Sequence, residues 1–207
     1  YISFDDGGSW QPFQINLPVT PVTDILVNRK DLVLSTMGRS FWILDDLTPL
    51  RQLDEKLAAM NFYVFKPREA YRMPGASYKA PGLGQNPPSG SVIYYYFKEK
   101  PKDEVILEIM DSNGSRVKKF SSLSKPEVET EEEFGWMFGG SLSQGIPAEA
   151  GMNRFVWNMR YPDAEKVPGA VLWGGSTAGP LAVPGIYQVK LTVGELSQIQ
   201  TWEWRKD

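Results

Sequence analysis

A glycine-rich turn near the start of the sequence holds the most regular spacing of polar residues. Ser3-Phe4-Asp5-Asp6-Gly7-Gly8-Ser9-Trp10 follows the pattern S-x-D-x-G-x-S/T-W. We expect the Asp5 carboxylate to accept hydrogen bonds from backbone N–H groups of the turn, and Gly7 to supply a positive φ angle that a β-branched residue resists. Trp10 should start the next strand and pack under the turn. The pattern therefore predicts a hairpin in which the roles of Ser3, Asp5, Gly7, Ser9 and Trp10 are structural.

A second group of charged residues lies between positions 38 and 46. Asp45 and Asp46 are adjacent carboxylates, and paired carboxylates perform glycoside hydrolysis. Neighbouring residues of a strand point to opposite faces, so these two cannot flank one bond, and a turn role is favoured. Arg39 follows Gly38 in the turn after the run Leu32–Thr36. It is a candidate contact for an anionic ligand or partner, and the simpler alternative is a salt bridge to Asp45 or Asp46.

Aromatic side chains raise the question of carbohydrate binding, because exposed rings stack on sugar faces. Trp136 and Trp173 lie in glycine-rich sequence, where packing explains a ring less readily, and they join Arg39 as candidate ligand contacts. The pairs Trp202/Trp204 and Tyr94/Tyr96 are each two residues apart on expected strands. We expect both pairs in the core of a sandwich, since aromatic residues fill such interiors.

The composition excludes several classes of chemistry. The 207 residues include no His and no Cys, which removes imidazole-based catalysis and the usual ligands of zinc and copper. Only carboxylate and carbonyl sites for Ca²⁺ or Mg²⁺ remain, and Asp111-Ser112-Asn113 offers one carboxylate, so a turn is favoured there. The net charge of -3 and the scattered Lys and Arg residues argue against nucleic acid as a partner. We therefore expect no catalytic residues, no metal site and no cofactor.

Short β-branched and aromatic runs, separated by Gly, Pro, Asn and Asp, predict an all-β fold. No apolar run reaches the length of about 18 residues that a membrane helix needs. The one helical candidate is Thr48–Met60, with Thr48 as N-cap and Pro49 in the first helical position. Asn113-Gly114 indicates a two-residue hairpin. The expected strands are Tyr1–Phe4, Asp24–Asn28, Leu32–Thr36, Phe41–Leu44, Phe62–Tyr71, Ser91–Lys98, Val105–Met110, Arg116–Phe120, Asn153–Arg160, Gly185–Val193 and Ser197–Trp204.

Three stretches lack such patterns. Met73–Gly90 is rich in Pro and Gly and should be a long loop or linker. Lys125–Glu133 is acidic and is followed by the glycine-rich Phe134–Gly145. We interpret these last two as an excursion from one side of a sheet.

The turn at Asp5 has a weaker repeat further along the chain. Aligning Asp5-Asp6 with Asp45-Asp46 gives a spacing of 45 − 5 = 40 residues, although the second copy lacks the glycines and the tryptophan. A period near 40 with about four strands per unit is typical of a β-propeller blade. Residues 1–53 would then hold the tail of one blade and most of a second. Since the chain begins at Tyr1 inside a strand-like sequence, we interpret it as part of a longer protein.

Two regions carry a resemblance to a known family. The run from Asp31 to Arg51, DLVLSTMGRSFWILDDLTPLR, resembles the end of the propeller in bacterial BNR/Asp-box repeat proteins, which share their repeat with sialidases and sortilin-type receptors. Residues 62–207 resemble the Ig-like module that follows in these proteins and that occurs in the flagellar hook-capping protein. The segments that carry this second resemblance are Phe65–Arg72, Asn86–Gly90, Val105–Gly114, Gly151–Arg160 and Pro184–Val193.

The resemblance implies a division into residues 1–53 as the end of a propeller, 54–60 as a linker and 61–207 as an Ig-like β-sandwich of roughly seven strands. It implies an extracytoplasmic (periplasmic or secreted) bacterial protein. Sialidases of this repeat family use an arginine cluster, a Tyr nucleophile with a Glu partner, and an acid Asp, but no position here matches that constellation. We therefore expect a non-catalytic accessory module that supports the propeller and contacts a carbohydrate or protein ligand. The alternative is a fragment of a glycoside hydrolase whose catalytic residues lie in the missing part of the propeller.

A blade and a fraction leave apolar strands uncovered. The side chains concerned are Ile25, Val27, Leu32, Leu34, Phe41 and Ile43. We expect them to pack on the Ig-like domain or on a second copy of the chain, which would make a homo-oligomer. The other candidate partner is the remainder of the propeller, in the same or a separate chain.

Overall fold

The computed structural model describes residues 1–72, 87–124, 145–165 and 177–206. Strands account for 47% of the structure and helix for 4%, which confirms the all-β prediction. The chain divides into two compact units, Tyr1–Leu47 and Thr48–Asp207.

The smaller unit contains an antiparallel sheet of three strands in chain order: β1 (Val22–Asn28), β2 (Asp31–Thr36) and β3 (Phe41–Leu44). These strands fall where the sequence predicts them. Short turns join them, and Arg29 (φ 57°) and Gly38 (φ 78°) take the left-handed backbone conformation that tight reversals require. The predicted strand Tyr1–Phe4 is reduced to a single bridge between Ile2 and Gln11.

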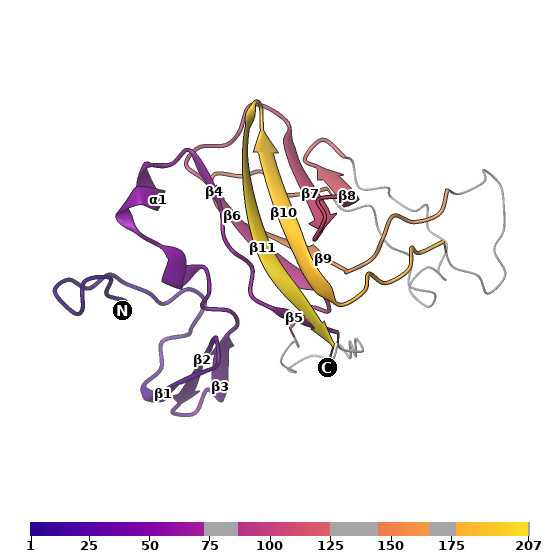
Figure 1. The fold of residues 1–207 in the computed structure, drawn as a ribbon. Helices are drawn as coiled ribbons and strands as arrows, with labels where there is room; N and C mark the ends of the chain where they lie inside the picture. The colour runs from indigo at the N-terminus through magenta and orange to yellow at the C-terminus, as the bar shows by residue number, and fades with distance from the viewer. Residues whose placement is uncertain (73–86, 125–144, 166–176, 207) are drawn as a thin grey trace, which may run out of the picture. The chain divides into compact units, whose positions relative to one another are not determined.

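The larger unit is sandwich-like, with two sheets facing each other across one core (Figure 1). The five-stranded sheet has the order β5-β11-β10-β7-β8, and the three-stranded sheet has the order β4-β6-β9. β5 pairs with β11 in parallel, whereas the other pairs are antiparallel. The strands are β4 (Phe62–Val64), β5 (Ala70–Arg72), β6 (Ser91–Phe97), β7 (Val105–Asp111), β8 (Arg116–Ser121), β9 (Gly151–Trp157), β10 (Gly185–Val193) and β11 (Leu196–Lys206).

Alternating side chains of both sheets build the core. Burial along β6 and β7 follows a period of two, so that one face of each sheet is covered and the other is open to solvent. Aromatic rings fill one end of the core: Trp157 and Trp202 meet edge to face at 6.1 Å, and Tyr187 contacts both tryptophans of β11. The side chains that are almost fully enclosed are Val64, Phe65, Ile93, Tyr95, Phe97, Val105, Leu107, Ile109, Trp157, Val189, Leu191 and Trp204.

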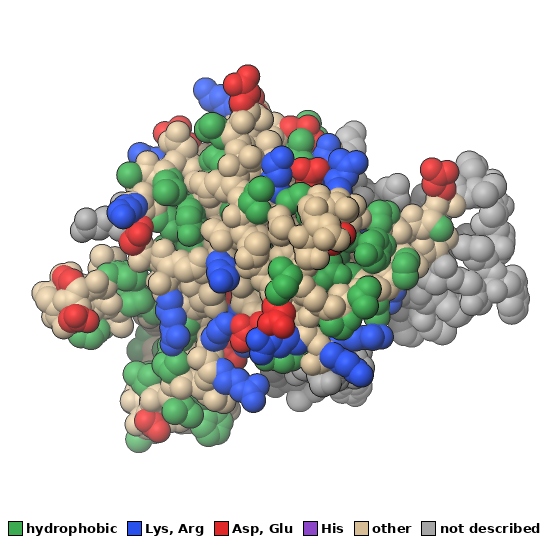
Figure 2. All heavy atoms as spheres, viewed as in Figure 1, with side chains coloured by type: hydrophobic (Ala, Val, Ile, Leu, Met, Phe, Trp, Pro, Cys, Tyr) green, Lys and Arg blue, Asp and Glu red, His purple; other side chains and the backbone are tan. Residues whose placement is uncertain are grey.

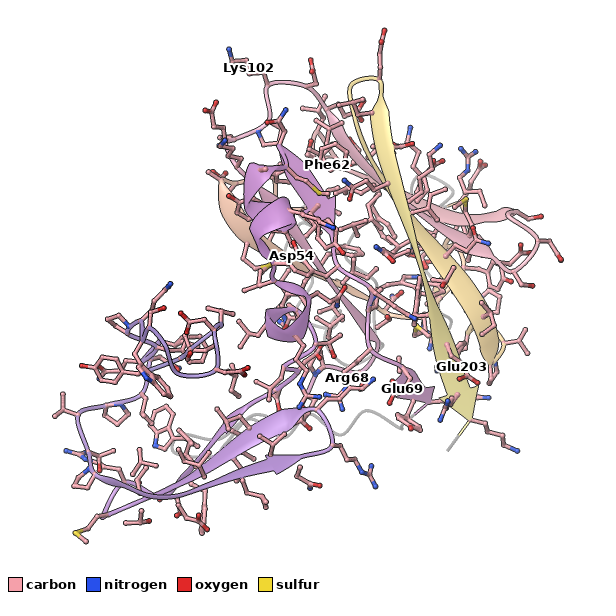
Figure 3. The ribbon with its side chains drawn as sticks, turned by 60° about the vertical axis from the view of Figure 1, so that its left-hand side comes forward. Asp54, Phe62, Arg68, Glu69, Lys102 and Glu203 are labelled. Atoms are coloured by element: carbon pink, nitrogen blue, oxygen red, sulfur yellow. The ribbon has the colours of Figure 1, made fainter. Side chains whose placement is uncertain are left out.

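The predicted helix Thr48–Met60 is wrong in its extent. The structure has a 3₁₀ turn, η1 (Leu50–Gln52), and then a single-turn helix, α1 (Glu55–Ala59). The reason is Asp54, whose extended backbone interrupts the segment and whose Oδ1 accepts the N–H of Leu57 at 2.7 Å. Figure 3 shows Asp54 at the start of α1. Asp54 is thus the N-cap that the sequence analysis assigned to Thr48.

Two predicted strands also have different extents. Phe62–Tyr71 is not one strand, because β4 and β5 belong to different sheets, and Pro67, which has no N–H to donate, lies between them. The strand predicted over Asn153–Arg160 ends at Trp157. Met159 has a φ of 58°, which breaks the extended backbone, and the indole of Trp157 donates to the carbonyl of Arg160 at 3.1 Å.

The hairpin between β7 and β8 has a four-residue connection, not the predicted two-residue one. Only Gly114 has a positive φ (79°), so a turn that needs positive φ at both Asn113 and Gly114 does not form. Asp111 organises the connection instead, since its Oδ1 accepts the N–H groups of Asn113 at 2.8 Å and Ser115 at 2.9 Å. Its carbonyl also accepts the N–H of Gly114 at 3.1 Å.

Two glutamine side chains hydrogen-bond to the backbone of the segment Phe62–Lys66, which begins with β4. The Gln198 amide of β11 accepts the Val64 N–H and donates to the Phe62 carbonyl, both at 3.0 Å. The Gln52 amide of η1 accepts the Lys66 N–H at 2.9 Å and donates to the Lys66 carbonyl at 3.1 Å. Each carboxamide therefore pairs with the backbone as a neighbouring strand would, and it joins the edge to a separate part of the larger unit.

We predict that Gln198→Ala lowers the free energy of unfolding of the larger unit by about 2–4 kcal/mol, since it leaves two backbone groups of a buried strand without partners. The matched control is Gln200→Ala, two residues along the same strand, for which we expect less than about 1 kcal/mol. Urea denaturation followed by tryptophan fluorescence measures both variants. Equal losses in the two would show that the Gln198 amide has no special role.

Candidate functional site

The turn at Asp5 has a dense local network of hydrogen bonds. The Asp5 carboxylate accepts the Ser9 N–H at 2.8 Å and the hydroxyls of Ser9 and Ser3 at 2.6 and 2.8 Å. The Ser3 hydroxyl oxygen in turn accepts the N–H of Gly7 at 2.7 Å. Reciprocal backbone bonds of 2.9 Å between Ile2 and Gln11 close the hairpin. Asp5 is the centre of this network and faces no other carboxylate within it, so its arrangement is that of a turn staple.

Backbone conformation explains the glycine and the tryptophan of the turn. Asp6 and Gly7 both have positive φ angles, 52° and 92°. A Cβ atom added at Gly7 would lie 3.7 Å from Cζ2 of Trp10, so the indole ring lies against the glycine. Trp10 nevertheless keeps 62% of its surface exposed. Its ring lines the turn on one side and presents the other to solvent.

Hydrogen bonding lowers the pKa of Asp5 from 3.8 to about 2, and the Ser9 hydroxyl is the largest cause. Because the pKa is lower in the folded turn than in the unfolded chain, ionised Asp5 stabilises the turn. This contribution is fully present at pH values above the pKa of the unfolded chain. This contribution is lost as the pH falls from about 4 towards about 2. The turn therefore keeps its charge network through mildly acidic conditions.

We predict that Ser9→Ala raises the pKa of Asp5 towards 3.8, and that Ser3→Ala raises it by less, since its hydroxyl ranks below both Ser9 interactions. A pH titration of the Asp5 Cγ chemical shift by NMR measures each value. Ser112→Ala, in the exposed turn between β7 and β8, is the control and should leave the pKa of Asp5 unchanged. A midpoint that does not respond to Ser9→Ala would contradict this reading of the turn.

The second aspartate pair lies just beyond β3. Asp45 is exposed, whereas Asp46 is buried and has a φ of 65°. The Asp46 N–H donates to Oδ1 of Asp31 at 2.8 Å, which ties the end of β3 to the start of β2. Asp6 and Asp46 are 46 − 6 = 40 residues apart and both have left-handed backbones. The spacing found in the sequence thus relates two aspartates that both have positive φ angles.

Arg39 lies in the turn between β2 and β3. Its side chain is exposed, and within the described part of the chain no ion pair joins it to Asp45 or Asp46. Its carbonyl accepts the indole N–H of Trp42 at 2.9 Å, which fixes the turn backbone. The structure thus leaves the Arg39 guanidinium open to solvent at one end of the sheet.

The other aromatic candidates have different outcomes. Trp136 and Trp173 lie outside the described residues. Trp202 and Trp204 are buried, which confirms the core prediction for this pair. The core prediction for Tyr94 and Tyr96 is wrong, because the alternation of β6 directs Ser91, Ile93, Tyr95 and Phe97 inward. Tyr94 and Tyr96 are half-buried on the outer side of the sheet.

The sheet of the smaller unit presents apolar side chains on both of its sides. Alternation and register place one set on what we call the Ile25 face: Ile25, Val27, Leu32, Leu34, Trp42 and Leu44. The opposite set forms the Leu26 face: Leu26, Val33, Phe41 and Ile43. On the Leu26 face 59% of Leu26, 75% of Phe41 and 60% of Ile43 are exposed. On the Ile25 face Ile25 and Val27 are exposed, whereas Leu32, Leu34, Trp42 and Leu44 are half-buried. Figure 2 shows hydrophobic side chains gathered over this sheet.

The sequence analysis named six of these side chains but did not separate them into two faces, and it omitted Leu26, Val33, Trp42 and Leu44. The available signal was the continuity of the apolar runs Ile25–Val27, Leu32–Leu34 and Phe41–Leu44. Continuous runs are typical of strands that are buried on both faces. These two faces are a candidate binding surface of the smaller unit.

Further comparisons leave the function to be inferred from this geometry. Across residues 1–72, 87–124, 145–165 and 177–206, no group of three or more acidic side chains is placed to share a metal ion. In the same ranges, no helix combines the length and the apolar character needed to cross a bilayer. The chain matches no protein-family model, no curated protein and no solved structure.

Proposed function

We propose that this chain is a non-catalytic accessory module of a larger bacterial BNR/Asp-box repeat protein. In this role residues 1–53 are the end of a β-propeller, residues 61–207 are an Ig-like sandwich, and the module supports the propeller. The observation that carries the proposal is the repeated spacing: Asp6 and Asp46 are 40 residues apart, and both have positive φ angles. Repeats of about this length are typical of propeller blades.

The two units differ in a way that favours a supporting role. The larger unit has its own core, formed between two sheets. The smaller unit has a sheet with apolar side chains exposed on both faces. A self-sufficient sandwich attached to an uncovered sheet is suited to holding that sheet within a larger body.

The proposed parent protein is extracytoplasmic, and the module contacts a carbohydrate or protein ligand there. Within the smaller unit the candidate contacts are the exposed Trp10 ring and the Arg39 guanidinium, which offer a stacking surface and an anion-binding group. Trp136 and Trp173 complete the proposed set of contacts.

The second candidate function is that of a glycoside hydrolase fragment whose catalytic residues lie elsewhere in the propeller. The feature that favours it is the pattern Ser3–Trp10, which sialidases of the resembling family also contain. In both functions the residues of this chain position other parts of the protein.

The two functions are separated by assaying the 207-residue chain and its full-length parent on the same panel of aryl glycosides, including aryl sialosides. We expect no turnover by the isolated chain. Turnover by the full-length protein alone would favour the hydrolase fragment, and its absence in both would favour the accessory module. Turnover by the isolated chain would overturn the proposal.

A further inference from the structure

The turn between β7 and β8 carries a sequence pattern that the proposed function does not use. Residues 111–115 read Asp-Ser-Asn-Gly-Ser, so that Asn113 is followed two positions later by Ser115. An asparagine with Ser or Thr at that spacing, and no proline between them, is the acceptor pattern of N-linked glycosylation. None of the other asparagines in the sequence has Ser or Thr two positions later. The chain thus contains one such pattern.

An acidic residue extends this pattern on its N-terminal side. Asp111 lies two positions before Asn113. Many bacterial oligosaccharyltransferases require Asp or Glu at this position of the acceptor, whereas the eukaryotic enzymes do not. A carboxylate at a fixed distance from the acceptor is a group that a cationic site on an enzyme binds specifically. The extended pattern therefore indicates the bacterial form of the reaction.

The structure gives the acceptor the exposed position that a transferase needs. All residues from 112 to 116 are exposed, and the turn leads into β8, the edge strand of the five-stranded sheet. Asn113 donates its backbone N–H to Asp111, but in the described part of the chain no hydrogen bond engages its carboxamide. A sugar attached to Nδ2 of Asn113 would therefore break no hydrogen bond of the sandwich.

The hydrogen bonds that shape this turn are local. Oδ1 of Asp111 accepts the N–H groups of Asn113 and Ser115 at 2.8 and 2.9 Å. The Asp111 carbonyl accepts the Gly114 N–H at 3.1 Å, and the Asp111 N–H donates to the Ser115 carbonyl at 2.9 Å. These four bonds all lie within residues 111–115. The turn can open to fit an enzyme while β7 stays paired with β10, and such local openings cost far less than global unfolding.

A competing reaction of the same residue is spontaneous deamidation. In that reaction the nitrogen of the following glycine attacks Cγ of the asparagine, ammonia leaves, and water then opens the cyclic imide. Here the Gly114 N–H is held by the Asp111 carbonyl, and Gly114 has a φ of 79°. The hydrogen bond keeps this nitrogen in the turn and opposes its attack on Asn113. The carboxamide is thereby preserved for an enzyme.

We propose that Asn113 is a site of N-linked glycosylation, modified by a bacterial oligosaccharyltransferase. The donor is an oligosaccharide linked to a polyprenyl pyrophosphate. Nδ2 of Asn113 bonds to the anomeric carbon of the first sugar, and the bond from that carbon to the pyrophosphate oxygen breaks. The amide loses one proton to a base of the transferase, and polyprenyl pyrophosphate leaves. The Asp111 carboxylate and the Ser115 hydroxyl are the recognition groups. This inference takes only the extracytoplasmic location from the proposed function, because the transfer occurs outside the cytoplasm.

The modification is tested on the full-length parent purified from its own bacterium. Trypsin cleaves after Lys102 and Arg116 and releases the peptide Asp103–Arg116, which contains the whole pattern. We expect mass spectrometry to find this peptide heavier by a whole number of sugar residues, and electron-transfer fragmentation to place them on Asn113. A peptide without sugar, or one that shows only the mass increase of deamidation, would overturn the proposal.

Variants expressed in the same bacterium test the recognition groups. We expect Asn113→Gln and Ser115→Ala to lose the sugar and Ser115→Thr to keep it. Asp111→Asn retains an oxygen that accepts the N–H groups of the turn but has no charge, and we expect it to lose the sugar as well. Asp111→Glu retains the charge and should keep it. Ser112→Ala, between the recognition groups, is the control and should keep the sugar. Retention of the sugar in Asp111→Asn or Ser115→Ala would overturn this assignment.

Two further measurements keep the outcomes separate. Circular dichroism identifies Asp111 variants that fail to fold, and the pair Ser115→Ala and Ser115→Thr then decides the test, since neither removes a hydrogen bond that the Ser115 backbone makes. Cell fractionation locates the parent protein. A cytoplasmic parent would defeat the proposed location, whereas an extracytoplasmic parent whose peptide carries no sugar would defeat only the glycosylation of Asn113.

Discussion

The short edge segment from Phe62 to Lys66 is the constraint on which the larger unit depends. β4 pairs with β6 on one side only, so the backbone groups on its other side need partners in a largely buried place. Gln198 comes from the opposite sheet and Gln52 from the segment before α1, and both supply those partners. Two carboxamides thereby tie the segment before α1 and the last strand, β11, to the same stretch of backbone.

The two units differ in how far their apolar surface is buried. In the sandwich, two sheets cover each other, and the outer side of β7 and β10 carries a charge ladder in which Glu108 contacts Arg116 and Lys190. The smaller sheet has no such solvated side, since both of its faces are apolar. Its turns are nevertheless well determined by Asp5, Asp31 and the indole of Trp42. Hydrogen bonds therefore order this unit locally, although its apolar side chains are only partly buried.

The all-β class and most strands were predictable, because alternation and turn residues are local signals. Phe41–Leu44 and Gly185–Val193 have the predicted boundaries. The errors arose where a distant or competing group decides the structure. Asp54 divides the expected helix by capping its second part, and Gln52 and Gln198 bind a segment that sequence reasoning treated as one continuous strand. The inward direction of Tyr95, and not of Tyr94 and Tyr96, depends on the register with β9 and β4, which no local pattern specifies.

The contact between Gln198 and β4 also affects the timing of synthesis. The two partners are 134 residues apart in sequence, and β5 likewise pairs with the end of β11. Contacts of such separation close large loops and form late. While a ribosome is still translating β10, β4 and β5 lack their partners on β11, and tryptophans of the core have not yet been made. The sandwich therefore completes its fold only after β11 has left the exit tunnel, and until then the nascent chain exposes apolar strands to chaperones.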